Sequence, residues 1–239
     1  AQKKGSCTMK SLRSAKTLAV IAAMLPVAGH AVTQCGPNIC YTYDPLQAAA
    51  AAFGTPTLLG DSMRFIPPSF RAESLNGAGT VTVTATWLFD NVYSTGGGEI
   101  GSVLITEAGD FSITGDSSGA ADSVGVNLYT QVANNASAEV AIDIKNFSAS
   151  GNTFAPPEPW ALISTAINPA TAFAMVANNV AVSIQNTLSA TTDELGGAAW
   201  IQKKFVVEIG TVAPVPVPAA VWLFGSAFGV LTLVRRRVV

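Results

Sequence analysis

The sequence is poor in the residues that most enzyme sites use. It holds a single histidine, His30, and three cysteines among 239 residues, and only 12% of its residues are charged. Because His30 lies in a predicted leader (below), the mature chain has no Ser-His-Asp or Cys-His site and no histidine metal site. The glycine run 96–98 lacks the Lys-Ser/Thr of a phosphate-binding loop. The sequence therefore offers few of the residues on which most catalytic sites depend.

The first residues that carry a recognisable signal begin at Met9, and Ala1 to Thr8 are set aside as upstream residues. Lys10, Arg13 and Lys16 precede an apolar run from residue 17 to 27. The segment then ends in a small-x-small pattern, Gly29-His30-Ala31. That order predicts a secretory signal peptide over 9–31, cut between Ala31 and Val32. A retained membrane helix is the alternative, although the run is short and broken by a proline.

Cysteine usage agrees with export. Cys7 precedes Met9, so the mature chain keeps Cys35 and Cys40, which enclose four residues. In an oxidising compartment this spacing predicts a tight disulfide. The rival interpretation, a metal-binding pair, finds no further cysteine or histidine to complete it.

The charge of the chain is divided unevenly along its length. Between residues 32 and 213 there are five basic residues and all 15 acidic ones, a net charge of −10. This excludes nucleic acid as an expected partner. It also disfavours direct binding to an anionic polysaccharide, unless a divalent cation bridges the two.

The segment 32–213 has the periodicity of β-structure. Residues 80–89 alternate strictly, with Val81, Val83, Ala85, Trp87 and Phe89 predicted to face inward and Thr82, Thr84 and Thr86 outward. Two further strands are expected, one with Val140, Ile142 and Ile144 inward, and one over 201–209 that Lys203 interrupts. Weaker candidates are 62–66, 102–106, 110–114, 124–132, 160–166 and 180–185, and the stretches 46–53 and 168–177 could be helical. About nine short strands separated by turn residues predict an all-β fold, an antiparallel β-sandwich or jelly roll.

The end of the chain combines three features in a fixed order. Residues 214–218 alternate proline and valine and predict an extended spacer, 219–234 carry no charge, and Arg235, Arg236 and Arg237 begin a basic tail over 235–239. Sixteen helical residues span about 24 Å, which makes a short transmembrane helix whose arginines mark the cytoplasmic side. A buried core element is the alternative interpretation.

The motif Val215, Pro216, Val217, Pro218, Ala219, followed by this apolar run and the arginines, resembles the PEP-CTERM sorting signal in its VPLPA-type variant. This chain has Val217 where the family usually has Leu or Glu. The resemblance covers about the last 25 residues. It implies a bacterial envelope protein handled by an exosortase-like membrane enzyme, and a role beside exopolysaccharide in a biofilm matrix.

Three kinds of ligand site are possible, each with an ordinary structural role as its alternative. No cofactor is expected, although Asp110, Asp116 and Asp122 with the polar loop 115–118 could supply oxygen ligands to Ca²⁺. Trp160 and Trp200 could stack on sugars, although such rings more commonly pack against other side chains of the protein. Paired carboxylates of a glycan hydrolase are possible in principle, but nothing in the sequence pairs Asp90, Glu99, Glu107 or Glu139 across the fold.

We therefore expect a non-enzymatic, membrane-anchored surface protein with a structural or adhesive role. A carbohydrate- or calcium-binding module on the same anchor is the second hypothesis, and a carboxylate-based hydrolase is a weaker third.

Overall fold

The computed structural model describes residues 31–115, 122–151 and 153–212, and the side chains of 153–156 and 205–212 are not among those described. The predicted leader apart from its last residue, Ala31, and the sorting motif, transmembrane helix, arginine tail and Asp116 lie outside the described residues. Within the described part of the chain, no helix has the length and apolar character needed to cross a membrane.

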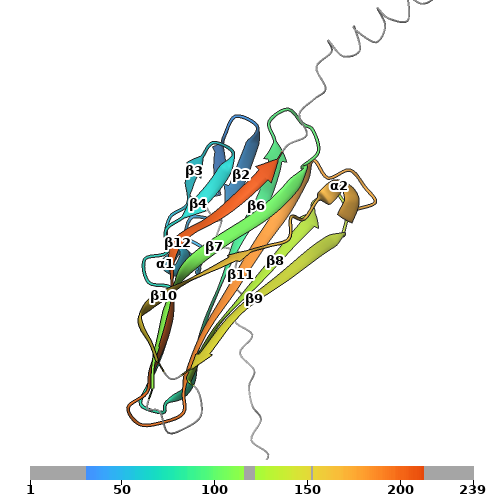
Figure 1. Cartoon of the computed structure of the whole chain (residues 1–239). Helices are drawn as coiled ribbons and strands as arrows, with labels where there is room; N and C mark the ends of the chain where they lie inside the picture. Colours follow the sequence, from blue (N-terminus) through green and yellow to red (C-terminus); the bar gives the residue numbers. More distant parts are fainter. Residues whose placement is uncertain (1–30, 116–121, 152, 213–239) are drawn as a thin grey trace, which may run out of the picture.

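Two antiparallel sheets face each other as a β-sandwich, as the sequence predicts (Figure 1). Sheet A contains, in spatial order, β1 (Val32–Cys35), β2 (Ile39–Tyr43), β6 (Gly79–Ser94), β11 (Asn179–Thr192), β8 (Asp122–Asn134) and β9 (Val140–Gly151). Sheet B contains β10 (Thr153–Ile163), β7 (Ser102–Thr114), β12 (Ala198–Val212), β4 (Ser62–Phe65) and β3 (Thr57–Leu59). β5 (Arg71–Leu75) pairs with the first part of β12, and β4 pairs with the second part.

The alternating segment 80–89 lies within the sixteen-residue strand β6, and its predicted faces are confirmed. Trp87 and Phe89 are buried, whereas every threonine of the opposite row is exposed. β11 pairs with β6 from Gly79 to Tyr93, and residues that pair across the two strands lie on the same face of the sheet. A strict period of two is therefore enough to assign the faces of a strand that lies inside a sheet.

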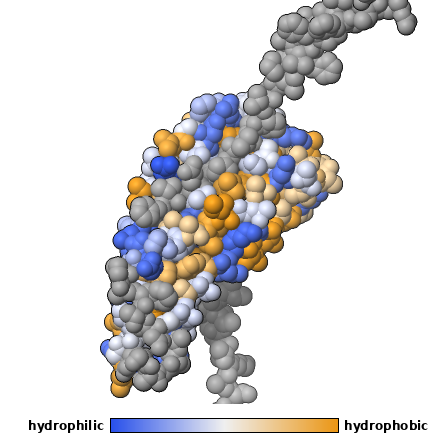
Figure 2. Space-filling view, viewed as in Figure 1, coloured by the Kyte–Doolittle hydropathy of each residue, from blue (hydrophilic) through white to orange (hydrophobic). Residues whose placement is uncertain are grey.

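The prediction for the faces of β9 was wrong. Val140, Ile142 and Ile144 point outward and are about half exposed, and the intervening residues face the other sheet. All residues of one parity share a face, and in β9 that parity is fixed by Phe147, whose ring packs on Phe111 and Trp160. The register with β8 agrees with this parity, because Phe147 pairs with Val126, which is buried. Figure 2 shows hydrophobic residues along the margin where Figure 1 places β9.

Several shorter predictions locate elements but miss their extent. The two candidates 102–106 and 110–114 belong to the single strand β7, and the helical stretches 46–53 and 168–177 contain only the one-turn helices α1 (Ala50–Phe53) and α2 (Pro169–Ala172). The strands β1, β2, β3 and β5 have five residues or fewer and were not predicted. Such short stretches carry few alternations, and among those of five residues or fewer only β4 was predicted, by the candidate 62–66.

Aromatic side chains fill the space between the sheets. Trp87 of sheet A packs on Phe65 of sheet B, with ring centroids 4.8 Å apart, and on Phe53 of α1 at 6.0 Å. Phe53 also contacts Phe65 and Phe70, at 5.6 and 5.5 Å. The short helix α1 therefore places the Phe53 ring between the two sheets, where it contacts rings of both. Edge-on contacts of this kind stabilise the core in addition to the burial of apolar area.

A buried ion pair interrupts this apolar core. Lys203 of β12 contacts Glu107 of β7 through its Nζ atom, and neither side chain has any solvent exposure. Nζ also lies 5.5 Å from the ring centroid of Phe53 and 5.7 Å from that of Phe70. Burial lowers the pKa of Lys203, and the neighbouring Glu107 opposes that shift only in part. The interruption that the sequence shows at Lys203 is therefore a charge inside the core.

The amino-terminal hairpin is held by a disulfide between Cys35 and Cys40. The carboxylate of Asp61 accepts hydrogen bonds from the backbone N–H groups of Asn38 (2.7 Å) and Ile39 (3.1 Å) and from the Asn38 side chain (2.7 Å). Burial raises the pKa of Asp61, but these hydrogen bonds outweigh it and leave the pKa below its ordinary value. The carboxylate thus fixes the disulfide hairpin to the β3–β4 turn.

Glycine at position 109 lets Trp160 cross β7. The Trp160 indole N–H donates to the Gln202 carbonyl at 3.2 Å, beside the bulge of β12 that follows Lys203. A Cβ atom at position 109 would lie 1.9 Å from the Gln202 carbonyl oxygen and 2.8 Å from the indole nitrogen.

We expect Gly109→Ala to lower the free energy of unfolding by about 2 kcal/mol or more, because the new methyl group overpacks a backbone contact. Urea unfolding followed by tryptophan fluorescence measures the change. Gly96→Ala is the matched control, since its Cβ would meet nothing closer than 3.8 Å. A Gly109→Ala variant as stable as the wild type would contradict the assigned packing.

Candidate functional site

The outward side of sheet A is a broad surface of hydroxyl and amide groups. We call it the hydroxyl face; it is formed by Thr80, Thr82, Thr84 and Thr86 of β6, Gln185, Thr187, Ser189 and Thr191 of β11, Asn127 and Tyr129 of β8, and Asn146 and Ser148 of β9. None of these residues carries a charge. Figures 1 and 2 are viewed from the side of sheet B, so this face is turned away from the reader.

The strand register aligns these side chains in rows across the sheet. Thr84 pairs with Thr187, which pairs with Asn127, which in turn pairs with Asn146. Neighbouring strands lie about 4.8 Å apart, and side chains on one face repeat roughly every 6.7 Å along a strand. The result is a regular array of polar groups over the four longest strands of sheet A.

Members of a row are bonded to each other across the strands. The hydroxyls of Thr80 and Thr191 lie 2.9 Å apart and those of Thr84 and Thr187 lie 3.0 Å apart. The side chain of Asn127 donates to that of Asn146 at 2.6 Å, and Gln185 donates to Thr86 at 3.1 Å. These bonds orient the side chains, while each hydroxyl oxygen keeps further hydrogen-bonding capacity for a ligand.

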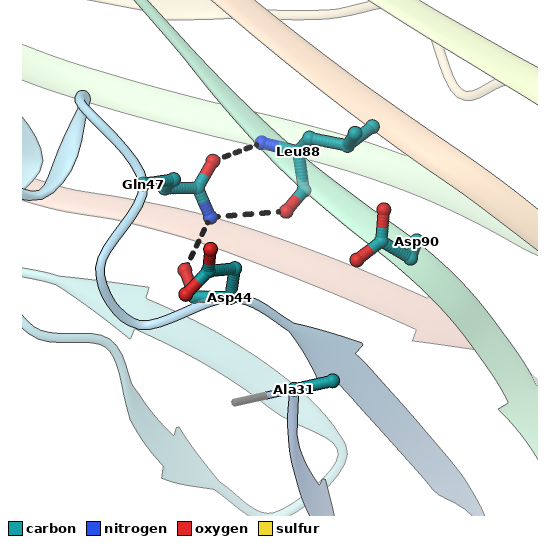
Figure 3. Close-up of a pocket in the computed structure, with 5 residues that line it drawn as sticks. All are labelled: Ala31, Asp44, Gln47, Leu88 and Asp90. Atoms are coloured by element: carbon teal, nitrogen blue, oxygen red, sulfur yellow. Dashed lines mark hydrogen bonds between the residues drawn. The ribbon is translucent and has the colours of Figure 1, made fainter. Parts of the chain in front are cut away.

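The threonine row of β6 continues into a hollow of about 430 Å³, shown in Figure 3. Its lining consists of Asp44, Gln47, Leu88 and Asp90, together with Ala31, the last residue of the predicted leader. Leu88 and Asp90 have the same parity as the threonines, so they extend the hydroxyl face at one end. An exposed leucine beside two carboxylates combines an apolar contact with hydrogen-bond acceptors.

Gln47 forms the wall of this hollow by replacing a missing strand. β2 ends at Tyr43, and its pairing with β6 ends at Asn91, so the backbone of Leu88 has no partner strand on that side. The Gln47 side chain accepts from the Leu88 N–H at 2.8 Å and donates to the Leu88 carbonyl at 3.2 Å (Figure 3). One side-chain amide therefore satisfies both backbone groups of an exposed strand residue.

The predicted sugar-stacking residues do not lie on the hydroxyl face. Trp160 is 3% exposed and its ring stacks on Phe147, so it has the packing role and leaves no ring face open. Trp200 lies on the outer side of sheet B, where the Arg71 guanidinium covers its ring at 4.3 Å. Both rings are engaged by other side chains of the protein.

The structure does not bring the predicted calcium ligands together. Asp110 is on sheet B, where it pairs with Lys204 at 2.5 Å, whereas Asp122 is buried on sheet A and accepts from the Asp193 N–H at 3.2 Å. Asp116 lies outside the described residues. Within the described ranges, no three cysteine, histidine or acidic residues gather where they could hold a metal ion.

The acids weighed for a hydrolase are dispersed as well. Glu107 is buried in its pair with Lys203, and Glu139 accepts from the Ala174 N–H at 2.7 Å. That hydrogen bond is the main cause of the lowered pKa of Glu139. Of the four candidates, Asp90 alone lines the hollow, together with Asp44, which no sequence pattern indicated. Asp44 and Gln47 lie in a loop, and no local pattern announced that they would meet β6.

We expect Gln47→Ala to lower the free energy of unfolding by about 1–2 kcal/mol, since it leaves the two Leu88 backbone groups without their partner. Urea denaturation measures the loss. Leu46→Ala, in the same loop and at an exposed position, is expected to stay within about 0.5 kcal/mol of the wild type. Equal stabilities of the two variants would refute the role given to Gln47.

Comparisons with known proteins do not identify the function of this chain. No family model matches the chain, and no curated protein matches it. One solved structure that matches comes from work on the promiscuous specificity of carbohydrate-binding modules from the β-sandwich superfamily. It is 9% identical, with a TM-score of 0.20, and the match covers 74% of this chain and 97% of that chain. A likeness this slight supports no transfer of function.

Proposed function

We propose that this chain is an exported, non-enzymatic surface module that binds neutral polysaccharide through the hydroxyl face. The observation that carries the proposal is the array itself: uncharged hydroxyl and amide side chains on four neighbouring strands, held in register by cross-strand hydrogen bonds. Sugars present hydroxyl groups that both donate and accept, which is the bonding capacity that these side chains offer.

The shape of the surface fits a polymer better than a small molecule. The four strands that form the hydroxyl face have 12 to 16 residues each, so the face is extended. The hollow beside Leu88 adds a local anchoring point, where Asp44 and Asp90 can accept from sugar hydroxyls. Many weak, equivalent contacts along a chain add up through effective concentration, which suits an adhesive matrix role.

The charge of the domain selects among polysaccharides. The segment 32–213 carries a net charge of −10, and the hydroxyl face holds no lysine or arginine. An anionic chain would be repelled by the acidic domain without finding a cation to pair with. Neutral glycans are therefore the proposed ligands.

Display outside the cell is the second part of the proposal. The leader over 9–31 would export the sandwich, the segment 219–234 would hold it as a transmembrane helix, and an exosortase-like enzyme would process the motif 215–219. The disulfide between Cys35 and Cys40 is compatible with an oxidising compartment outside the cytoplasm.

Affinity electrophoresis tests the binding surface. In gels cast with dextran, hydroxyethylcellulose or galactomannan, we expect at least one polymer to retard the domain, and alginate to leave its mobility unchanged. Thr84→Glu places a charge in the middle of the array and should weaken binding about tenfold or more, the equivalent of about 1.4 kcal/mol. Thr57→Glu, an exposed position on β3 of sheet B, is the matched control. Retardation that Thr84→Glu leaves unchanged would disprove the proposed surface.

Fractionation of a bacterial host that expresses the full chain tests the display. We expect a mature protein that begins at Val32, sits in the membrane fraction and has both remaining cysteines protected from alkylation. A chain truncated after Pro218 should appear in the soluble exported fraction instead. An uncut leader and two reactive thiols in the cytosol would rule out export.

A further inference from the structure

Three polar side chains lie buried in the core of the sandwich. Lys203, Glu107 and Asn186 each have a fractional exposure of 2% or less. An ammonium group, a carboxylate and a carboxamide at such a depth are costly unless their hydrogen bonds are complete. Here they are not complete.

Asn186 is the least satisfied of the three. It lies on the inward row of β11, between Ala85 of β6 and Leu128 of β8, and neither its Nδ2 nor its Oδ1 atom has a hydrogen-bond partner. Oε1 of Glu107 lacks a partner too. Native cores rarely leave a whole carboxamide unbonded, so this group calls for an explanation other than packing.

A series of ring contacts leads from the neighbourhood of Asn186 on β11 toward the ion pair. Ile184, the next inward residue of β11, pairs with Trp87, whose ring packs on Phe53. The ring of Phe53 in turn lies 5.5 Å from Nζ of Lys203. Lys203 therefore borders these rings on the side of sheet B, and Asn186 lies one inward position along β11 from the residue that borders them on sheet A.

We propose that Lys203 and Asn186 form an intramolecular isopeptide bond, with Glu107 as the catalytic acid and base. Glu107 accepts a proton from the Lys203 ammonium group, and the freed lone pair on Nζ attacks Cγ of Asn186. The Cγ–Nδ2 bond then breaks, and Glu107 relays a proton from the attacking nitrogen to the departing one. The products are one new amide, which joins Nζ to Cγ, and one molecule of ammonia.

The surroundings favour each step of this reaction. Burial lowers the pKa of the Lys203 amine, which increases the neutral, nucleophilic form. Nζ of Lys203 already donates a hydrogen bond to Glu107, so the proton can pass directly from the amine to the carboxylate. No hydrogen bond holds the carboxamide of Asn186, so none has to break when it turns toward Nζ. The apolar rings around the site exclude the water that would hydrolyse the product.

The product relieves the defects that the three side chains create. A neutral amide in the core costs far less than a buried ammonium group, and it uses up the unbonded Nδ2. The new bond would also tie sheet A to β12, the last described strand, which leads into the predicted spacer. A pull transmitted from a membrane anchor would then meet a covalent link between the two sheets.

Intact mass spectrometry of the denatured full chain tests the proposal. We expect a mass lower than that of the disulfide-bonded linear sequence by one ammonia, and a branched peptide on digestion that contains both Lys203 and Asn186. The branched peptide is the decisive readout, because an Asn-Gly pair such as Asn76-Gly77 can lose ammonia by cyclising within one linear peptide. Loss of one water instead would mean that Lys203 is joined to a carboxylate such as Glu107, and would overturn the role of Asn186.

Matched variants complete the test. Lys203→Arg keeps the positive charge without a nucleophilic amine, and Asn186→Ala removes the acyl donor, so both should show the linear mass. Glu107→Gln should fold, as judged by circular dichroism, and form the bond at least tenfold more slowly. Lys204→Arg, one residue from the site and exposed, should keep the mass loss of the wild type. A wild-type chain with the linear mass, or a cross-link that survives in Lys203→Arg, would overturn the proposal.

Discussion

The contact between Trp87, Phe53 and Phe65 is the constraint on which the rest of the sandwich depends. These rings come from sheet A, from a one-turn helix and from a short strand of sheet B, and together they set how the two sheets meet. The inward parity of β6 follows from burying Trp87, and its threonine row is outward for the same reason. The hydroxyl face is thus a consequence of the core: one strand cannot bury its aromatic row without displaying the opposite row.

The two proposed activities use opposite sides of the same strands. β11 contributes Gln185 and Thr187 to the hydroxyl face and Asn186, the residue between them, to the core. A polysaccharide held on the outer face would load sheet A, whereas the predicted anchor follows β12 of sheet B. A covalent bond between β11 and β12 would join the loaded sheet to the anchored one, so binding and cross-linking would serve one mechanical purpose.

The sequence predicted most where one face of a strand is strongly favoured. The β-sandwich, the faces of β6 and the buried interruption at Lys203 could all be predicted from local alternation. The faces of β9 could not, because Phe147 and the three aliphatic residues compete for opposite parities, and only the positions of Phe111 and Trp160 decide which parity is buried. In the candidate site, the threonine row was visible in the sequence, but its role as a face needed β11 and β8 alongside. The roles of Gln47 and Asp44 follow from a loop that meets β6 more than forty residues away.

By itself, the sequence determined the fold class, the acidic charge of the segment 32–213 and the absence of histidine chemistry from it, because composition and a period of two are local properties. Tertiary structure alone decided which side chains became neighbours. Glu107 and Lys203 are 96 residues apart and meet only because β7 pairs with β12, and Asn186 shares their core only because two sheets stack. Burial then changes what these groups can do: it lowers the pKa of Lys203, which favours the neutral amine that the proposed bond requires.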